Sequence, residues 1–176
     1  MSKLILQSAR LTLREMAWDD LDFVATMLAD PLVMRHYPKC YSRDEASIWL
    51  EHMIKRYSAD GHALWLVSDR TTQEPMGQVG LLRQLVDDVY EPEIGYLIHA
   101  PFWQQGFASE AAAAVRDYAF DTLGKERVIS LIRPVNVPSQ RVALRIGLKP
   151  EKLTTFKGHE SLVFSRPRPA TTGCPA

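Results

Sequence analysis

The segment Glu93-Ile-Gly-Tyr-Leu-Ile-His-Ala-Pro-Phe-Trp-Gln-Gln-Gly-Phe-Ala-Ser-Glu110 decides the fold of this chain of 176 residues. Its first part alternates apolar residues and predicts a strand that ends at Ile98. A short polar loop follows, and an alanine-rich amphipathic helix is then predicted from about Ser109 to Leu123. This order leaves free backbone N–H groups at the helix start, where the helix dipole adds partial positive charge. We therefore expect the loop to bind a phosphate group.

A second informative segment lies further along the chain. Asn136-Val-Pro-Ser139 leads into a short helix predicted for residues 139–146, which Gly147 ends. Before it, residues 127–132 form a short, continuous apolar run and predict a strand that is buried on both faces. The loop before Ser109 is weak evidence alone, but the two segments together are much more specific.

The rest of the chain gives ordinary signals for strands and helices. Further strands are predicted at residues 10–14, 63–68, 76–82, 149–156 and 160–165. Helices are predicted between Asp19 or Asp20 and Asp30-Pro31, and between Ser42 and Gly61. Ser42 and Glu45 have the spacing of a capping box, which marks the start of the second of these helices. Residues 33–41 have no clear period and are expected to form a loop or short turn.

Composition and charge exclude several classes of protein. Lys plus Arg and Asp plus Glu number 21 each, so the formal net charge is zero and a nucleic-acid partner is not expected. No segment is long enough to span a membrane and no N-terminal targeting signal is visible, so we expect a cytoplasmic protein with no membrane partner. Cys40 and Cys174 suggest no disulfide framework, and the five histidines have no metal-ligand spacing. We predict one domain over residues 1–166 and a flexible tail at 167–176.

These segments resemble the GNAT superfamily of N-acetyltransferases, and in particular the ribosomal-protein N-terminal acetyltransferases. The resemblance covers nearly the whole chain and rests on residues 93–96, 103–111 and 136–139, with Gly147-Leu148. It implies a mixed α/β fold whose central sheet is mostly antiparallel, with about six or seven strands and about four helices. It also implies acetyl-CoA as the donor and a primary amine as the acceptor, either a protein N-terminus or a small molecule. The oligomeric state, monomer or homodimer, stays open.

The resemblance places the cofactor on two parts of the chain. The loop from Trp103 to Ala108 resembles the family's pyrophosphate-binding loop, in which Gly106 lets the backbone approach the phosphates closely. Trp103 stands where the superfamily prefers Arg or Gln, so Arg141 or Arg145 is expected to supply the missing cation. The implied cofactor-binding residues are Leu97, Ile98, His99, Trp103, Gln104, Gln105, Gly106, Phe107, Ala108, Ser109, Asn136 and Ser139.

The resemblance also suggests how the reaction is catalysed. Glu93 matches an acidic position of this branch and is the candidate base, acting directly or through water. Many relatives carry a Tyr seven residues after Asn136 as the acid for the leaving thiolate, but this chain has Ala143 there. Ser139 is therefore the candidate hydrogen-bond donor to the thiolate. Water is the alternative, since a thiol pKa of about 8.5 makes an acid less necessary.

Two other functions are alternatives to this prediction, and one acidic segment has two interpretations. A non-catalytic module that binds or senses acyl-CoA is favoured by Ala143 and disfavoured by Glu93 with the Asn136–Ser139 pair. A nucleotide-binding domain is disfavoured because the chain has neither a Walker-type lysine nor a Gly-x-Gly-x-x-Gly motif. The acidic run of Asp87, Asp88, Glu91 and Glu93 is expected either to be a solvated turn or to attract a cationic acceptor.

Overall fold

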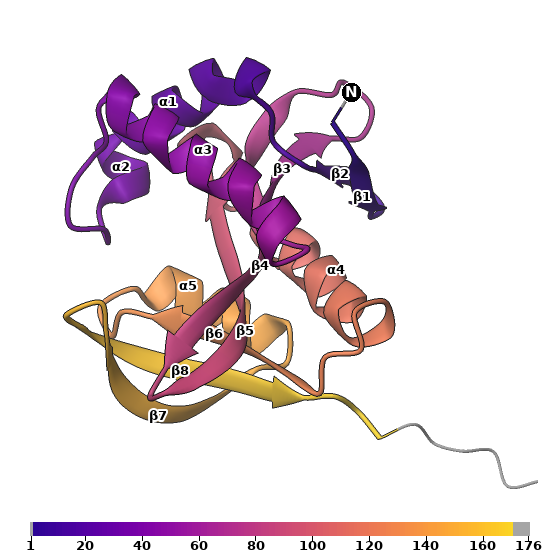
Figure 1. Cartoon of the computed structure of the whole chain (residues 1–176), viewed down its shortest axis with the longest axis vertical. Coiled ribbons are helices and arrows are strands. Elements are labelled where there is room, and N and C mark those ends of the chain that lie inside the picture. Colours follow the sequence, from indigo (N-terminus) through magenta and orange to yellow (C-terminus); the bar gives the residue numbers. More distant parts are fainter. Residues whose placement is uncertain (1, 171–176) are drawn as a thin grey trace, which may run out of the picture.

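A computed structural model describes residues 2–170, which form one eight-stranded sheet with five α-helices packed around it (Figure 1). The strands lie in the order β1-β2-β3-β4-β5-β6-β8-β7, and every neighbouring pair is antiparallel except β5 and β6. Their bounds are β1 Leu4–Gln7, β2 Leu11–Arg14, β3 Leu64–Asp69, β4 Pro75–Val86, β5 Val89–Ile98, β6 Arg127–Ile132, β7 Lys149–Phe156 and β8 His159–Pro167.

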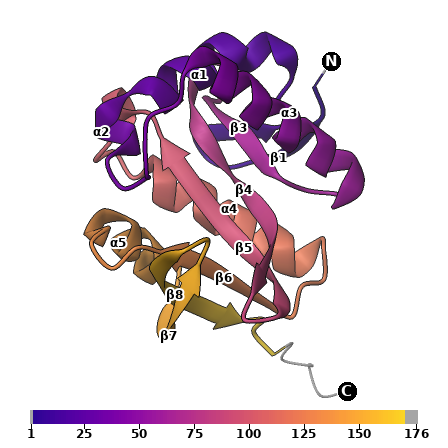
Figure 2. The same ribbon diagram turned by 60° about the vertical axis from the view of Figure 1, so that its left-hand side comes forward.

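The helices divide between the two faces of the sheet. Their bounds are α1 Leu21–Ala29, α2 Pro31–Met34, α3 Arg43–Ala59, α4 Phe107–Asp121 and α5 Val137–Arg145, with 3-10 turns at Trp18–Asp20 and Ala100–Phe102. α1 and α3 lie over one face, and α4 runs along the other (Figure 2). Within the described residues, no helix is long and apolar enough to cross a bilayer.

Alternation along β4 assigns its side chains to these two faces. Val79 and Leu81 belong to the core that α4 covers, because successive strand residues point to opposite faces. Gln78, Leu82 and Gln84 therefore point to the face that carries α1 and α3, where Leu82 packs against the second core. This second face is the floor of one of the two cavities described below.

The sheet opens between its two parallel strands. Within residues 2–170, β5 and β6 share a single register pair, Glu93 with Ile129. β5 runs on to Ile98 beyond that point, paired with β4 alone. The diverging strands create the opening into which the site is built.

The structure confirms the mixed α/β class and differs in the number of elements. β1 was not predicted, since Leu4–Gln7 has no alternating pattern of its own, and it pairs with β2. A short helix, α2, forms where a loop or turn was expected to begin, because Asp30 caps its start and Pro31 occupies the first helical position. The capping box of Ser42 and Glu45 is confirmed. β8 ends at Pro167, and residues 171–176 of the predicted tail lie outside the described residues.

Candidate active site

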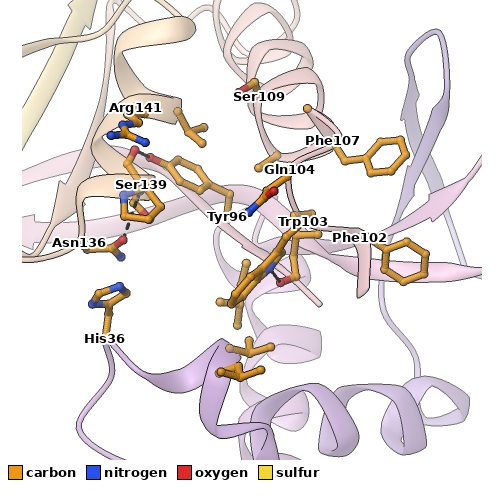
Figure 3. A pocket seen from close by; sticks show the side chains of 18 of the residues that line it. His36, Tyr96, Phe102, Trp103, Gln104, Phe107, Ser109, Asn136, Ser139 and Arg141 are labelled. Carbon is orange, nitrogen blue, oxygen red and sulfur yellow. Dashed lines mark hydrogen bonds between the residues drawn. The ribbon is translucent and has the colours of Figure 1, made fainter. Parts of the chain in front are cut away.

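The loop before α4 has the conformation that an anion-binding helix start requires. Gly106 is the N-cap of α4 and adopts φ +82°, a left-handed conformation that favours glycine. The first helical bond joins the Glu110 N–H to the Gly106 carbonyl oxygen. The N–H groups of Phe107, Ala108 and Ser109 precede that bond, so they have no partner within the helix. These three residues line a cavity of ≈ 430 Å³, which we call the first cavity (Figure 3).

An arginine from the start of β2 holds this loop in place. The Arg10 guanidinium donates to the Gln105 carbonyl oxygen at 3.1 Å and, through Nε, to Glu110 Oε2 at 2.7 Å. The Arg10 backbone N–H and the Ser8 hydroxyl both donate to Glu110 Oε1. The guanidinium also lies 4.3 Å from the centroid of the Phe107 ring. These contacts join the loop to the first turn of α4 and to the start of β2.

Three further arginines give the first cavity a positive charge. Arg141 and Arg145, both from α5, line it, as the sequence suggested for the cation that Trp103 replaces. Arg35, which follows α2, also lines it and lies 5.2 Å from the centroid of the Trp103 ring. Arg35 comes from a segment far away in the sequence, so the motifs gave no sign of it. A polyanionic ligand suits this wall.

The free edge of β5 offers a short row of backbone groups to the opening. The His99 N–H donates to the Met76 carbonyl oxygen, so these opposite residues form a hydrogen-bonded pair. Hydrogen-bonded pairs alternate in an antiparallel ladder, and the N–H and C=O of Leu97 therefore also point to β4. Those of Tyr96 and Ile98 point away from β4, into the opening.

Side chains already form hydrogen bonds with some of the backbone groups on this edge of β5. Trp103 Nε1 donates to the Ile98 carbonyl oxygen at 2.6 Å, and the Ser130 hydroxyl donates to the Ile94 carbonyl oxygen at 2.8 Å. The N–H and C=O of Tyr96 and the N–H of Ile98 remain for a ligand that lies along the strand. The edge that faces the cavity is thus centred on Tyr96 and Ile98, whereas the His99 N–H is already bonded within the sheet.

Asn136, Ser139 and Tyr96 form the wall opposite this edge. Asn136 is the N-cap of α5, and its Oδ1 accepts from the Ser139 N–H at 3.2 Å. The Tyr96 hydroxyl donates to the Ser139 carbonyl oxygen at 2.6 Å (Figure 3). Both backbone groups of Ser139 are thereby engaged, while the residue lines the cavity. Burial raises the pKa of Tyr96, so its hydroxyl keeps the proton that it donates.

A second cavity of ≈ 430 Å³ lies on the α1–α3 face and meets the first. The residues that line both are His36, Tyr37, Tyr96, Leu97, Asn136 and Ser139. Glu93 lines the second cavity and is only 9 % exposed. Its Oε2 accepts from Gln84 Nε2 at 2.7 Å. Burial raises the pKa of Glu93 above its ordinary value, which is the direction that makes a carboxylate a better base.

A histidine stands where the two cavities meet. His36 follows α2, and its Nε2 is buried without a hydrogen-bond partner among residues 2–170. In Figure 3 its ring lies near the Asn136 side chain. Burial and the positive charges of Arg35 and Arg133 lower the pKa of His36, so its ring is neutral at pH 7.

The structure distributes the predicted site residues over both cavities. Those that line the first cavity are Leu97, Ile98, Trp103, Gln104, Gly106, Phe107, Ala108, Ser109, Asn136 and Ser139. Glu93 lines only the second cavity, and His99 and Gln105 line neither. His99 Nε2 lies 3.9 Å from Asp30 Oδ2, while Gln105 contributes its carbonyl oxygen to Arg10. Sequence reasoning missed Tyr96, although it belongs to the Glu93–Tyr96 motif itself.

The acidic run before the loop does not form a cationic acceptor site. Asp87 Oδ2 pairs with Lys152 Nζ at 2.6 Å, and Asp87 Oδ1 accepts from the Thr154 hydroxyl. Glu91 Oε2 lies 3.2 Å from Arg127 Nε. Only Glu93 of this run lines the second cavity. Asp87 and Asp88 instead form the tight turn between β4 and β5, both with positive φ.

Comparison with known proteins agrees with this geometry. Residues 10–149 match the acetyltransferase (GNAT) domain family. The N-acetyltransferase YoaA of Bacillus subtilis (strain 168) is 29 % identical over 149 residues, which are 84 % of this chain and 84 % of that protein.

Solved structures share the whole fold. An acetyltransferase from Agrobacterium tumefaciens has a TM-score of 0.77 at 29 % identity, over 92 % of each chain. RimL, the ribosomal L7/L12 alpha-N-protein acetyltransferase solved in complex with coenzyme A, has a TM-score of 0.77 at 18 % identity. That match covers 94 % of this chain and 98 % of RimL, and at this identity the likeness is one of fold.

Proposed function

The chain belongs to the GNAT acetyltransferase family, as its three motifs predicted, and we propose that it transfers the acetyl group of acetyl-CoA to a primary amine by direct attack. Acetyl-CoA occupies the first cavity and the amine approaches through the second. One observation carries this proposal: the two cavities meet at Tyr96, Leu97, Asn136 and Ser139. A thioester and an amine that enter from opposite sides reach each other only at this junction.

The first cavity supplies what the donor needs. The free N–H groups after Gly106 and the helix dipole would hold the pyrophosphate. Arg35, Arg141 and Arg145 would balance the remaining phosphate charge. The pantetheine arm would lie along β5 and bond with the N–H and C=O of Tyr96 and the N–H of Ile98. An extended chain that adds to a strand edge in this way gains hydrogen bonds along its length.

The chemical step needs no covalent enzyme intermediate. The amine nitrogen attacks the thioester carbon, a C–N bond forms, and the C–S bond breaks with its electron pair left on sulfur. Negative charge develops on the carbonyl oxygen during the attack, and the free N–H groups of Tyr96 and Ile98 are placed to stabilise it. The products are an acetylated amine and coenzyme A.

Glu93 is the group that we propose accepts the amine proton, directly or through water. It lies in the second cavity, where the amine arrives, and Gln84 fixes its orientation. Its raised pKa brings it closer to the pH at which the enzyme works. The amine becomes neutral before it attacks, which an α-amino group with a pKa near 8 does far more readily than a lysine side chain.

Ser139 takes the part of the tyrosine that Ala143 replaces. Ala143 is completely buried in the core and offers no hydrogen-bonding side chain. Ser139 lines the junction, and its backbone is held from both sides by Asn136 and Tyr96. Its hydroxyl would donate to the departing thiolate, which then takes a proton from solvent.

Thiol release that depends on added amine tests the function. Purified protein is mixed with acetyl-CoA, and free coenzyme A is measured with and without a panel of primary amines. We expect release with at least one amine, and its loss in Glu93→Gln. Acetyl-CoA binding without release for any amine would instead support the non-catalytic module that senses acyl-CoA.

A further inference from the structure

We propose that the second cavity takes a small primary amine that carries an aromatic or apolar group and an anionic group, recognised by Gln78 and Lys157. This inference rests on the proposed function, since it assigns the acceptor of the same reaction. It excludes polycationic acceptors, among which polyamines and aminoglycosides are the obvious representatives.

The first observation is a buried amide with an unused hydrogen-bonding atom. Gln78 lies on β4, lines the second cavity and is 3 % exposed. Its Oε1 is buried and has no partner within residues 2–170. Buried polar atoms are nearly always paired, because an unpaired one costs about 1–3 kcal/mol. Gln78 lies opposite Leu97, a residue of the junction, so its amide is placed to accept an N–H of the acceptor.

The second observation is the apolar character of the cavity wall. Leu28, Met34, Tyr41, Trp49, Leu82 and Phe156 contribute to it. They come from α1, α2, α3, β4, β7 and the segment before α3, so five elements and a loop converge on one apolar space. A volume of ≈ 430 Å³ falls within the range of small-molecule sites. Aromatic walls of this kind stack well with an aromatic group of the ligand.

The third observation is the sign of the charge around the cavity. Lys157 and Arg133 line it, with His36 and His159, whereas Glu93 is its only acidic residue. Neither Lys157 nor Arg133 takes part in an ion pair of the described residues. Lys157 is exposed in the turn between β7 and β8, and while burial raises the pKa of Glu93, the positive charge of Lys157 is one of the smaller influences that lower it.

These observations together define the acceptor. A polycation would bring extra positive charge to Lys157 and Arg133 and would find one buried carboxyl in return, so it is repelled. An anionic group next to the amine would pair with Lys157 at the entrance of the second cavity. The apolar part of the acceptor would pack against the aromatic residues of the wall. The amine itself would lie between Gln78 and Glu93.

A charge reversal at the mouth tests this assignment. The kcat/KM values of L-phenylalanine and phenethylamine are compared in the unmodified protein and in Lys157→Glu. Since each amine is compared with itself, its intrinsic basicity cancels. We expect the ratio of kcat/KM for L-phenylalanine to kcat/KM for phenethylamine to fall about tenfold, because Lys157→Glu replaces an attraction for the carboxylate by a repulsion, while any effect on Glu93 is common to both amines. Lys149→Glu, on the same hairpin but outside both cavities, is the matched control and should leave both amines unchanged.

A second variant tests the amide. Gln78→Leu keeps the volume and removes the unpaired oxygen, so its melting temperature should not fall. We expect the KM of both amines to rise about fivefold, the value of one neutral hydrogen bond, with no change in the Kd of acetyl-CoA. An unchanged amine KM would remove Gln78 from the acceptor site.

The outcomes separate the inference from the function on which it rests. Fast acetylation of spermidine, or of peptide N-termini alone, would overturn the small anionic acceptor and leave the acetyltransferase intact. Equal losses for L-phenylalanine and phenethylamine in Lys157→Glu would overturn the role of Lys157. Absence of thiol release with every amine, while acetyl-CoA still binds, would overturn the function itself.

Discussion

The Tyr96 hydroxyl on β5 donates a 2.6 Å hydrogen bond to the carbonyl oxygen of Ser139 on α5. This bond spans the opening where β5 and β6 diverge, so it ties the strand that would hold the donor to the helix start that would receive the thiolate. Tyr96 is therefore a positioning residue for Ser139.

Tyr96→Phe removes this bond and keeps the ring. We expect kcat to fall about tenfold, because Ser139 loses one of the two side chains that hold its backbone. The Kd of acetyl-CoA should change by less than about threefold, since the backbone groups of residue 96 remain. Steady-state kinetics and calorimetry check this together. If the Kd weakens as much as kcat falls, the hydroxyl is needed for the β5 edge to bind acetyl-CoA and not for the position of Ser139.

Glu93 makes the stability of the fold depend on pH. Its pKa is raised in the folded protein, so the folded state holds the proton more tightly than the unfolded state. Its contribution to the free energy of unfolding is full below the ordinary Glu pKa of about 4.3 and falls as the pH rises through the folded pKa. Each unit of upward shift corresponds to about 1.4 kcal/mol.

Glu93→Gln should therefore be more stable than the unmodified protein at pH 8 and equal to it at pH 4. Melting temperatures across this range test the expectation. Glu151→Gln is the control of opposite sign. The pKa of Glu151 is lowered by its hydrogen bonds and by Arg127, so this variant should lose stability at pH 8. A difference for Glu93→Gln that does not vary with pH would show that the pKa of Glu93 is the same in the folded and unfolded states.

Two variants distinguish whether Glu93 or the neighbouring His36 accepts the amine proton. Glu93 and the neutral His36 both line the second cavity. With Glu93 as the base, Glu93→Gln should lower kcat about 100-fold or more and remove the acidic limb of the pH–rate profile. His36→Gln should keep that limb and lower kcat by less than about tenfold. The reverse pattern would make the His36 imidazole the proton acceptor.

Arg10 lines neither cavity, but we expect it to influence the affinity for acetyl-CoA through the loop that it holds. Arg10→Ala removes the side-chain bonds to the Gln105 carbonyl oxygen and to Glu110 Oε2. We expect the Kd of acetyl-CoA to rise about five- to tenfold, since the free N–H groups of the α4 start would have to be ordered by the ligand. Arg43→Ala, which breaks a pair with Asp22 on the surface, is the matched control and should bind normally. Equal affinity in both variants would show that the loop holds its shape without Arg10.

Local signals were enough to predict most of the elements. The strand at 127–132 has the bounds of β6, and the capping box of Ser42 sets the start of α3. β1 was missed because four residues that depend on pairing with β2 carry little pattern of their own. The predicted strand 76–82 stops four residues short of the end of β4, where Gln84 is buried to hold Glu93.

The site was predictable only where one continuous segment builds it. The loop around Gly106 and the Asn136 cap follow from nearby residues. Arg35, His36 and Gln78 arrive at the cavities from other parts of the chain, through the packing of α2 and the register of β4. The acidic run left two interpretations open for a similar reason, since its partners Lys152 and Arg127 lie on strands that are distant in the sequence.

Calorimetric titration of acetyl-CoA tests the central claim most directly, with the unmodified protein, Gly106→Trp and Gly124→Trp. Both glycines have positive φ and are exposed, but only Gly106 lines the first cavity, so Gly124 controls for backbone strain. We predict micromolar binding, about −8 kcal/mol at a Kd of 1 μM, which disappears in Gly106→Trp and persists in Gly124→Trp. No binding to the unmodified protein, or equal binding to all three, would contradict the placement of acetyl-CoA at the start of α4.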